Sequence, residues 1–512
     1  MTRPTALLLA LLLPAVLAGQ AVERADTPKK GKLRLTFDPT VETWEAAFTP
    51  EGRQALGAFL SADSLGSAGV PSLGAMQTAV QAASGLSAFT ASLGRTLLAL
   101  RSERRVTPLT AEVGLTDRLS VSLMVPIVRV DVRETLNVDS AAANLGFNPL
   151  YFGGAASYTA FFSHFDQALA QLDAQISGGS CAPRCAEAQA LSAQGHAVRS
   201  ALSVAVYGTG PSSPSPFLPL ARSAAGQGID TTVITIQRQL ADSFGVTGFP
   251  DTLALPAFAA SSDDVQQLLT DPTFGFDYAP IERTPKFYRY WPGDAELAAK
   301  YRVLVGPDYA GAVTFTVRLP TGHQASPNDP FALSTGDHQT DLQLGYIQEW
   351  TLWNRLWLNA NARVGLQLPG TTDRRVAPPG AFWVPAAAAA RLDWKPGNYV
   401  ALDLAPMYRF ARTFAAGVTV GYYRQGSDRY TYAAPQDSVA LATRLGAPVS
   451  AAVLDAGTNR RVWQLGLAVT YTGPVWETGF SVQQAVSGWG AGTSVPAGTT
   501  FRLVFRTFHS LF

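Results

Sequence analysis

Polar and apolar side chains alternate along the stretch LWLNANARVGLQL, at residues 356–368. Trp357, Asn359, Asn361 and Arg363 share one face, while leucines, alanines and a valine form the other. A period of two is that of a β-strand, so the indole, amide and guanidinium groups would point to one side of a sheet. Such groups form hydrogen bonds and ion pairs. They indicate a surface along which a solute could pass.

Charged residues of both signs have the same phase in other alternating runs. The further candidates for this polar face are Arg302, Arg318, Glu349, Asp403 and Arg409. Opposite charges enclosed in a narrow lumen usually pair with one another. Two interpretations therefore stay open, a purely structural charge network and a solute pathway.

The histidines do not form a recognisable catalytic motif. There are five, namely His164, His196, His323, His338 and His509. The sequence has no G-x-S-x-G nucleophile motif, no glycine-rich phosphate loop before a helix and no zinc-ligand spacing. It therefore predicts no catalytic residues, no cofactor and no metal site. A cation site formed by His323, Asp329, Asp337 and His338 is the less favoured alternative to solvated loop residues.

The two cysteines, Cys181 and Cys185, lie four positions apart in SGGSCAPRCAEA. An exported chain meets an oxidising environment, so we expect them to form one disulfide with a small loop. A metal or redox role is the alternative, but a lone C-x-x-x-C lacks two further zinc ligands.

The N-terminus has the layout of an export signal. Arg3 precedes an apolar run from Ala6 to Ala18, which small residues follow. This run is too short to span a membrane as a helix, so residues 1–21 are predicted to be a secretory signal peptide. No later segment has 18 uncharged apolar residues in succession.

The composition of the chain is unusual for a soluble globular domain. Charged residues make up 15% of it and aromatic residues 10%, whereas soluble domains carry about 25% charged residues. The net charge of +1 gives no sign of a nucleic-acid partner. Low charge, abundant glycine and export together favour a β-barrel in the cell outer membrane.

Turn lengths support this fold class. Alternating runs of strand length meet at short links near 115–119, 305–311, 351–356, 410–414 and 471–476. Long segments separate these hairpins, as the extracellular loops of outer-membrane barrels do. Five hairpins plus one strand at each terminus predict an all-β membrane protein, a transmembrane barrel of about twelve antiparallel strands over residues 22–512. Residues 384–394 resemble a strand but would break the even count, so they are assigned to a loop.

Aromatic residues mark both the short turns and the end of the chain. Tyr and Trp at the turns are typical of the membrane–water boundary. The final residue, Phe512, resembles the terminal signal by which bacterial outer-membrane proteins are recognised for insertion, and Phe508 fits the same pattern. Ser510 and Arg506 do not fit it. The resemblance implies the barrel-assembly machinery as a partner, beside outer-membrane lipid.

Two hairpins resemble a known family. The stretches TAEVGLTDRLSVSLMVPIVRVDVR (110–133) and GNYVALDLAPMYRFARTFAAGVTVGYYRQGSDRY (397–430) are similar to outer-membrane proteins grouped with a phenol-degradation pathway and often described as transporters. The resemblance covers about half of the chain. It implies a barrel and says little about a substrate.

Two long insertions, 45–104 and 135–292, depart from compact members of that family. Helical patterns occur at 49–60 and 87–102 in the first insertion and at 157–176, 185–207 and 261–271 in the second. We expect large helical insertions in the extracellular loops, which either cap or plug the barrel. Their apolar faces could bury one another or form a hydrophobic ligand groove.

The sequence thus predicts passive passage or capture of small solutes, with hydrophobic solutes among the candidates. A structural or surface-interaction protein that acts through its helical cap is the alternative. A membrane-embedded hydrolase comes third, because no catalytic motif supports it.

Overall fold

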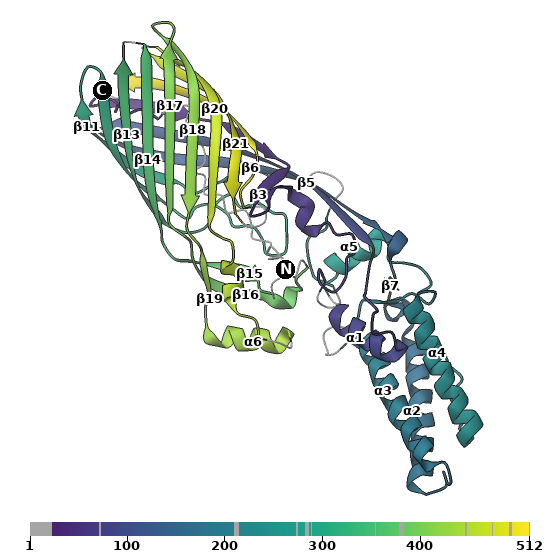
Figure 1. The fold of residues 1–512 in the computed structure, drawn as a ribbon. Coiled ribbons are helices and arrows are strands. Elements are labelled where there is room, and N and C mark those ends of the chain that lie inside the picture. The colour runs from purple at the N-terminus through teal and green to yellow at the C-terminus, as the bar shows by residue number, and fades with distance from the viewer. Residues whose placement is uncertain are drawn as a thin grey trace.

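The computed structural model describes residues 23–70, 73–208, 215–272, 275–281, 286–287, 289–353, 355–377, 383–445, 448–473, 475–490 and 494–510. The predicted signal peptide, residues 1–21, and Phe512 lie outside these residues. A barrel forms one part of the molecule, and an elongated helical arm extends from one of its ends (Figure 1).

The barrel confirms the predicted fold class. Its strands follow one another around the wall in the order β1/β2, β5, β6, β11, β12, β13, β14, β17, β18, β20, β21 and β22, and β22 pairs back onto β1 and β2. All these pairings are antiparallel. Because β1 and β2 are two pieces of one strand, interrupted at Asp38 and Pro39, the closed wall has twelve strands. The bounds are β1 (Lys32–Phe37), β2 (Thr40–Trp44), β5 (Arg95–Gly114), β6 (Leu119–Asp139), β11 (Glu296–Val305), β12 (Tyr309–Arg318), β13 (Asp341–Leu352), β14 (Leu356–Gln367), β17 (Tyr399–Arg409), β18 (Phe414–Gln425), β20 (Arg460–Thr472), β21 (Trp476–Trp489) and β22 (Thr499–Ser510).

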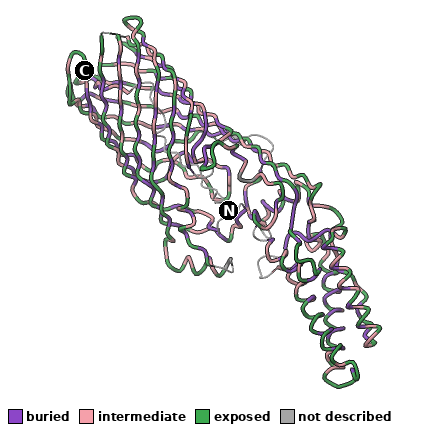
Figure 2. Tube along the Cα trace, viewed as in Figure 1, coloured by how far each residue is buried: buried purple, intermediate pink, exposed green. Residues whose placement is uncertain are grey.

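Exposed and buried residues alternate along these strands (Figure 2). On β20, the apolar side chains Leu465, Leu467 and Val469 are exposed, whereas Gln464 and Ala468 face inward and are buried. The alternation arises because successive side chains of a strand point to opposite sides of the sheet. An apolar exterior around a polar interior is the arrangement that a membrane barrel requires.

Aromatic side chains surround the end of the barrel that carries the short turns. Trp353, Phe410 and Phe414 are exposed there, and Tyr471 packs between Phe414 and Trp476 with ring centroids 5.0 and 4.4 Å apart. Such a girdle marks one membrane–water boundary, and short turns lie on the periplasmic side. The protein is an outer-membrane β-barrel whose long loops and helical arm lie on the extracellular side.

The arm is carried by β5 and β6, which stay paired from Gly114 and Ser120 to Arg95 and Asp139, beyond the rest of the wall. Its helices are α1 (Leu73–Ser84), α2 (Ala155–Ser177), α3 (Cys185–Tyr207), α4 (Ala224–Arg238) and α5 (Ser262–Thr270). The short strands β7 (Leu145–Phe147) and β8 (Phe217–Pro219) pair at its base. The arm lies outside the barrel and does not plug it (Figure 1).

The apolar faces of the arm helices pack against one another. Phe161, Phe165, Leu169 and Leu172 of α2 are at most 1% exposed, and the Phe165 ring stacks on Phe249 at 4.4 Å. These residues belong to the largest apolar cluster of the protein. Mutual burial therefore accounts for the apolar stripe that the sequence shows on this helix.

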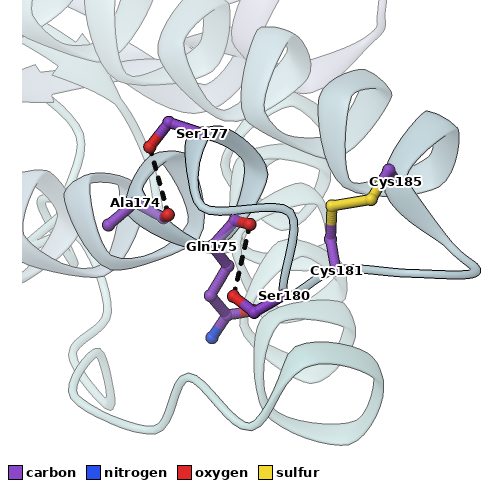
Figure 3. The surroundings of a disulfide bond; sticks show 6 residues. All are labelled: Ala174, Gln175, Ser177, Ser180, Cys181 and Cys185. Carbon is purple, nitrogen blue, oxygen red and sulfur yellow. Dashed lines mark hydrogen bonds between the residues drawn. A yellow bond between two sulfur atoms is a disulfide. The ribbon is translucent and has the colours of Figure 1, made fainter.

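The predicted disulfide joins Cys181 to Cys185 at the turn between α2 and α3 (Figure 3), with the two Cα atoms 4.8 Å apart. The turn is further held by the hydroxyl of Ser177, which donates to the Ala174 carbonyl at 3.1 Å. The Ser180 hydroxyl donates to the Gln175 carbonyl at 3.3 Å. The disulfide thus fixes the tip of the arm.

Two helix predictions in the first insertion are wrong. Residues 49–60 form part of the hairpin β3 (Ala46–Thr49)–β4 (Gly52–Ala55) and the short 3-10 helix η2 (Leu56–Leu60). Residues 95–102, within the predicted helix 87–102, belong to β5. Pairing with the distant β6 decides this outcome, and a local apolar pattern does not reveal such a partner. The helix of this region is α1.

A small second sheet lies beside the extracellular end of the barrel. It contains β15 (Gly370–Arg375), β16 (Ala389–Lys395) and β19 (Arg429–Tyr432), with α6 (Pro435–Leu445) against it. The segment 384–394 therefore stays out of the barrel wall, as predicted, although part of it is a strand. The two-residue strands β9 (Lys286–Phe287) and β10 (Trp291–Pro292) pair with β6. Within the described ranges, no helix is long and apolar enough to cross a membrane.

A lipid-face substitution tests this architecture. We expect Leu467→Arg to lower the free energy of barrel unfolding by about 2–4 kcal/mol, because it places a charge near the middle of the membrane. Urea titration of the protein folded into phospholipid vesicles measures the change. Val439→Arg on α6 is the matched control, since Val439 is 67% exposed and Leu467 is 68% exposed, and we expect it to change stability by less than about 0.5 kcal/mol. Equal effects of the two substitutions would contradict the assigned membrane face.

Candidate functional site: the charged lumen

Ion pairs cross-link the inner faces of neighbouring strands. The guanidinium of Arg318 on β12 donates to Glu296 on β11 and to Asp341 on β13, each at 2.9 Å. Arg363 on β14 pairs with Asp403 on β17. These charges project inward because the apolar residues of the same strands occupy the other face, toward lipid.

Two further pairs lie at the seam where the barrel closes. Arg34 on β1 pairs with Glu112 on β5, and Arg502 on β22 pairs with Asp38, which lies between β1 and β2. Arg34 and Arg502 are at most 4% exposed. A charge buried this deeply is stable only when it is paired, so the Arg502–Asp38 pair helps to hold the last strand against the first, and the Arg34–Glu112 pair holds the first strand against β5.

Residues 23–26, called here the N-terminal segment, lie inside the barrel, and residues 27–31 lead from it to β1 beside the turn between β5 and β6. The backbone carbonyl of Glu23 accepts a hydrogen bond from Asn359 Nδ2 at 2.6 Å. Its carboxylate accepts one from Asn361 Nδ2 at 3.1 Å and lies 3.4 Å from Lys300 Nζ. The segment is thus attached to β14 and β11.

Arg24 and Asp26 also contact strands on the other side of the lumen. Arg24 Nη1 donates to Glu477 on β21 at 2.8 Å, and the guanidinium lies 5.7 Å from the centre of the Trp357 ring. Asp26 accepts from Arg34 on β1 at 3.1 Å. Since β14 and β1 lie opposite one another in the ring of twelve strands, a segment that contacts both crosses the lumen.

The crossing point is tightly packed. The backbone N–H of Ala25 donates to Glu349 at 3.1 Å. Its side chain is fully buried against Ala312 and Ile347, which are neighbours on β12 and β13. A solute that passes through the barrel must therefore displace this segment or move around it.

A cavity of about 200 Å³ remains beside the N-terminal segment. Its cationic lining residues are Arg24, Arg34, Lys300, Arg318, Arg363, Arg502 and Arg506. Its anionic lining residues are Glu23, Asp38, Glu112 and Glu296. The walls also include polar and apolar side chains, such as Thr110 and Met124, and the lumen therefore holds an enclosed space rather than a solid core.

The structure brings most of the predicted polar-face residues close to the N-terminal segment, and leaves two of them apart from it. Those that contact the N-terminal segment, or an ion pair near it, are Trp357, Asn359, Asn361, Arg363, Arg318, Glu349 and Asp403. Arg302 and Arg409 lie toward the short-turn ends of β11 and β17. Whether any of these residues takes part in transport stays a prediction.

The N-terminal segment was not identified in the sequence as part of the lumen. Glu23, Arg24 and Asp26 follow the predicted signal-peptide cleavage region, where charged residues usually continue into solvent. The sequence feature that could have indicated this placement is the presence of three charged residues within four positions, shortly before the first strand. They fit the lumen because each has a partner of opposite charge on the wall.

Carboxylates also gather at the extracellular mouth, outside the membrane strands. The Asp337 backbone N–H donates to Asp294 at 3.0 Å, and the Asp337 carboxylate accepts from the side chain of Gln339 at 3.2 Å. Burial, followed by the nearby carboxylates of Asp341 and Asp294, raises the pKa of Asp337 to about 8. The folded loop between β12 and β13 therefore favours the protonated form of Asp337 over the ionised form.

The histidines of the arm pair with aspartates. His164 lies 2.6 Å from Asp251. Asp173 contacts both the Ser192 hydroxyl, at 2.5 Å, and His196, at 2.9 Å. A hydrolytic triad requires the histidine between the serine and the carboxylate, whereas here the carboxylate stands between them. This arrangement does not activate Ser192.

The loop residues considered as a cation site are not brought together as ligands. His323 stacks on Trp291, with ring centroids 5.9 Å apart. In the part of the chain that the structure describes, no three His, Cys, Asp or Glu side chains are placed to hold a metal ion.

The high pKa of Asp337 predicts a pH dependence. Its pKa in the folded state, about 8, exceeds the usual value of 3.8, so between these pH values the unfolded chain binds fewer protons than the folded chain. The free energy of unfolding therefore falls as pH rises through this window, by at most about 1.4 kcal/mol for each unit of displaced pKa. We expect amide protection in residues 321–340 to fall as pH rises from about 4 to 8, beyond the intrinsic change of exchange rate, and to fall no further above pH 8.

Asp337→Asn should remove most of this pH dependence. Asp373→Asn, at an exposed position of β15, makes the same chemical change and is the matched control. The assignment is wrong if Asp337→Asn and the unmodified chain show the same exchange profile against pH.

Comparison with known proteins supports the predicted grouping. Residues 235–447 match the family model described as "Putative MetA-pathway of phenol degradation". This segment includes the hairpin at 397–430, whereas the hairpin at 110–133 lies outside it. The match confirms the resemblance to the phenol-degradation group of outer-membrane proteins. No curated protein matches the chain.

Several solved structures are similar to the chain at low identity. An outer membrane channel from Pseudomonas putida F1 is 8% identical, with 95% of this chain and 98% of that chain covered and a TM-score of 0.42. The toluene transporter TbuX of Ralstonia pickettii is 8% identical, with 94% and 90% covered and a TM-score of 0.29. A FadL homologue of Pseudomonas aeruginosa is 8% identical, with 98% and 100% covered and a TM-score of 0.30.

Proposed function

We propose that this outer-membrane barrel is a passive channel for small solutes, and that its N-terminal segment restricts the passage. The observation that carries the proposal is the lumen cavity beside Glu23 and Arg24. Closed barrels with a packed interior have no such space, and wide porins leave an open aqueous channel. Twelve strands with a segment across the lumen fit a narrow, regulated passage.

The way in which the segment is attached supports its movement. Most of its contacts to the wall are hydrogen bonds and ion pairs, such as those of Glu23 and Arg24. Water and ions can replace contacts of this kind when the segment leaves. Only Ala25 is held mainly by apolar packing. The cost of displacement is therefore lower than that of removing a folded plug domain with its own core.

The path toward the periplasm contains an apolar section. Trp357, Met407, Ala415 and Ala468 form a buried cluster on the inner face near the short turns. A solute with an apolar part could contact this surface after the charged cavity. The family description, which refers to phenol degradation, is compatible with a small organic solute.

Other roles are less well supported by the residues. The projecting arm favours surface interaction as the second candidate function, because it extends far beyond the barrel wall (Figure 1). We propose no catalytic role, since Asp173 separates Ser192 from His196. Insertion by the barrel-assembly machinery, with Phe508 and Phe512 as the signal, also stays a proposal. Phe508 pairs with Arg34 of β1, and Phe512 lies outside the described residues.

Planar-bilayer conductance of the refolded protein tests the channel. We expect a small steady conductance for the chain that starts at residue 22. A variant without residues 23–27 should show a larger single-channel conductance, because the contacts that cross the lumen are lost. The matched control keeps the length of the segment but replaces residues 23–27 by serine, and its conductance should lie between the other two.

The folded state of each variant is checked by circular dichroism and by heat-modifiable migration in gels. If the truncated barrel is folded but neither it nor the intact chain conducts, the channel proposal is wrong. Surface interaction through the arm would then be the leading function.

A further inference from the structure

We infer that the lumen cavity binds the anionic group of a small organic solute, so that the passage favours organic anions over cations. This inference rests on the proposed channel and specifies its substrate class. It is carried by the charge, the hydrogen-bond donors and the apolar surface of a single cavity.

The cavity wall has an excess of positive charge. Seven of its lining side chains are cationic and four are anionic, a difference of 7 − 4 = +3. The carboxylates that balance the remaining cations do not line the cavity. Asp341 and Asp403, for example, contact Arg318 and Arg363 from the wall, so the two arginines line the enclosed space and their carboxylate partners do not.

Enclosure strengthens the effect of this charge. Arg318 and Arg502 are at most 5% exposed. Charges in a narrow cleft with low-dielectric walls concentrate counter-ions more strongly than charges on an open surface. An anion that enters the cavity therefore gains attraction, whereas a cation of the same size is repelled.

The guanidinium groups also retain unused donors. Each guanidinium has five N–H donors and no acceptor. The Nε of Arg363 and the Nη1 of Arg502 have no hydrogen-bond partner among the described residues. Both residues line the cavity. A carboxylate supplies acceptors in the planar geometry that guanidinium groups bind best, and small side-chain shifts would bring the two together.

The same cavity also has apolar surface. Pro108, Met124 and Ala298 line it, among polar residues of the same neighbouring strands β5, β6 and β11. An inorganic anion would leave this surface exposed to water. An organic anion with a short apolar body could bury it, and the volume of about 200 Å³ limits the ligand to a small molecule.

Benzoate, benzyl alcohol and benzylammonium provide a matched set of probes, because they share a ring and differ in charge. Single channels of the intact protein are recorded in a gradient of potassium chloride, and each probe is then added. We expect a reversal potential that shows preference for chloride. Benzoate should reduce the chloride current at lower concentration than benzyl alcohol, and benzylammonium should have the weakest effect.

The double variant Arg363→Gln/Asp403→Asn identifies the site. It removes one cation from the cavity and also its partner, so no uncompensated buried charge is left to prevent folding. The reversal potential should move toward zero, and benzoate should bind about tenfold more weakly, as expected for the loss of a charge-assisted hydrogen bond. Arg391→Gln, on the exposed face of β16, removes a cation outside the barrel and should change neither quantity.

Calorimetric titration of benzoate into the detergent-solubilised protein separates this inference from the channel proposal. Benzoate binding that weakens in the double variant, in a barrel that does not conduct, would support the anion site and refute the channel. A conducting barrel that prefers cations, or that responds equally to benzoate and benzylammonium, would overturn the anion inference and leave the channel standing. Absence of benzoate binding by calorimetry would overturn the anion site in either case.

Discussion

In the membrane interior no water is available to backbone N–H and C=O groups, and β22 meets this constraint by pairing with β21 on one side and with β1 and β2 on the other. Closure leaves no strand edge in the lipid. It also divides every strand into two faces, of which one contacts hydrocarbon and the other contacts an enclosed lumen. The apolar exterior and the charged interior both follow from this division.

The enclosed lumen imposes a second requirement, because charges placed there lose most of their hydration. Neighbouring strands satisfy part of it by pairing residues across the wall, as Arg318 does with Glu296 and Asp341. The N-terminal segment supplies further partners, since Glu23, Arg24 and Asp26 each meet an opposite charge on the wall. The same contacts that stabilise the lumen therefore also narrow it. Each cation around the central cavity has a carboxylate partner, but more cationic than anionic side chains line the cavity itself.

The extracellular parts are stabilised as soluble domains are, by burial of apolar side chains, because water surrounds them. The arm has an ordinary apolar core of aromatic and aliphatic side chains, and a disulfide closes its tip. The small sheet of β15, β16 and β19 has a separate core around Leu392 and Trp394. The membrane strands, by contrast, have no common apolar core, and backbone pairing and the surrounding lipid hold them together. The extension of β5 and β6 is the physical link between the barrel and the arm.

The sequence alone determined what depends on local periodicity. The alternation of polar and apolar residues predicted which face of β14 and β20 contacts lipid. The alternation of short and long links predicted twelve strands and their orientation in the membrane. The spacing of the two cysteines predicted the disulfide. The helix of residues 157–176 was also readable, because its stripe of Phe and Leu has a helical period.

Only the tertiary structure decided matters that depend on distant partners. Residues 95–102 became a strand because β6 extends alongside them, although their local pattern resembles a helix. Asp337 acquired a raised pKa because folding buries it near Asp341 and Asp294. The N-terminal segment entered the lumen because its charges match partners that lie more than 270 positions away in the chain, such as Lys300 and Glu477. Periodicity reports the environment of one element, whereas ion pairing and burial depend on which elements the closed barrel brings together.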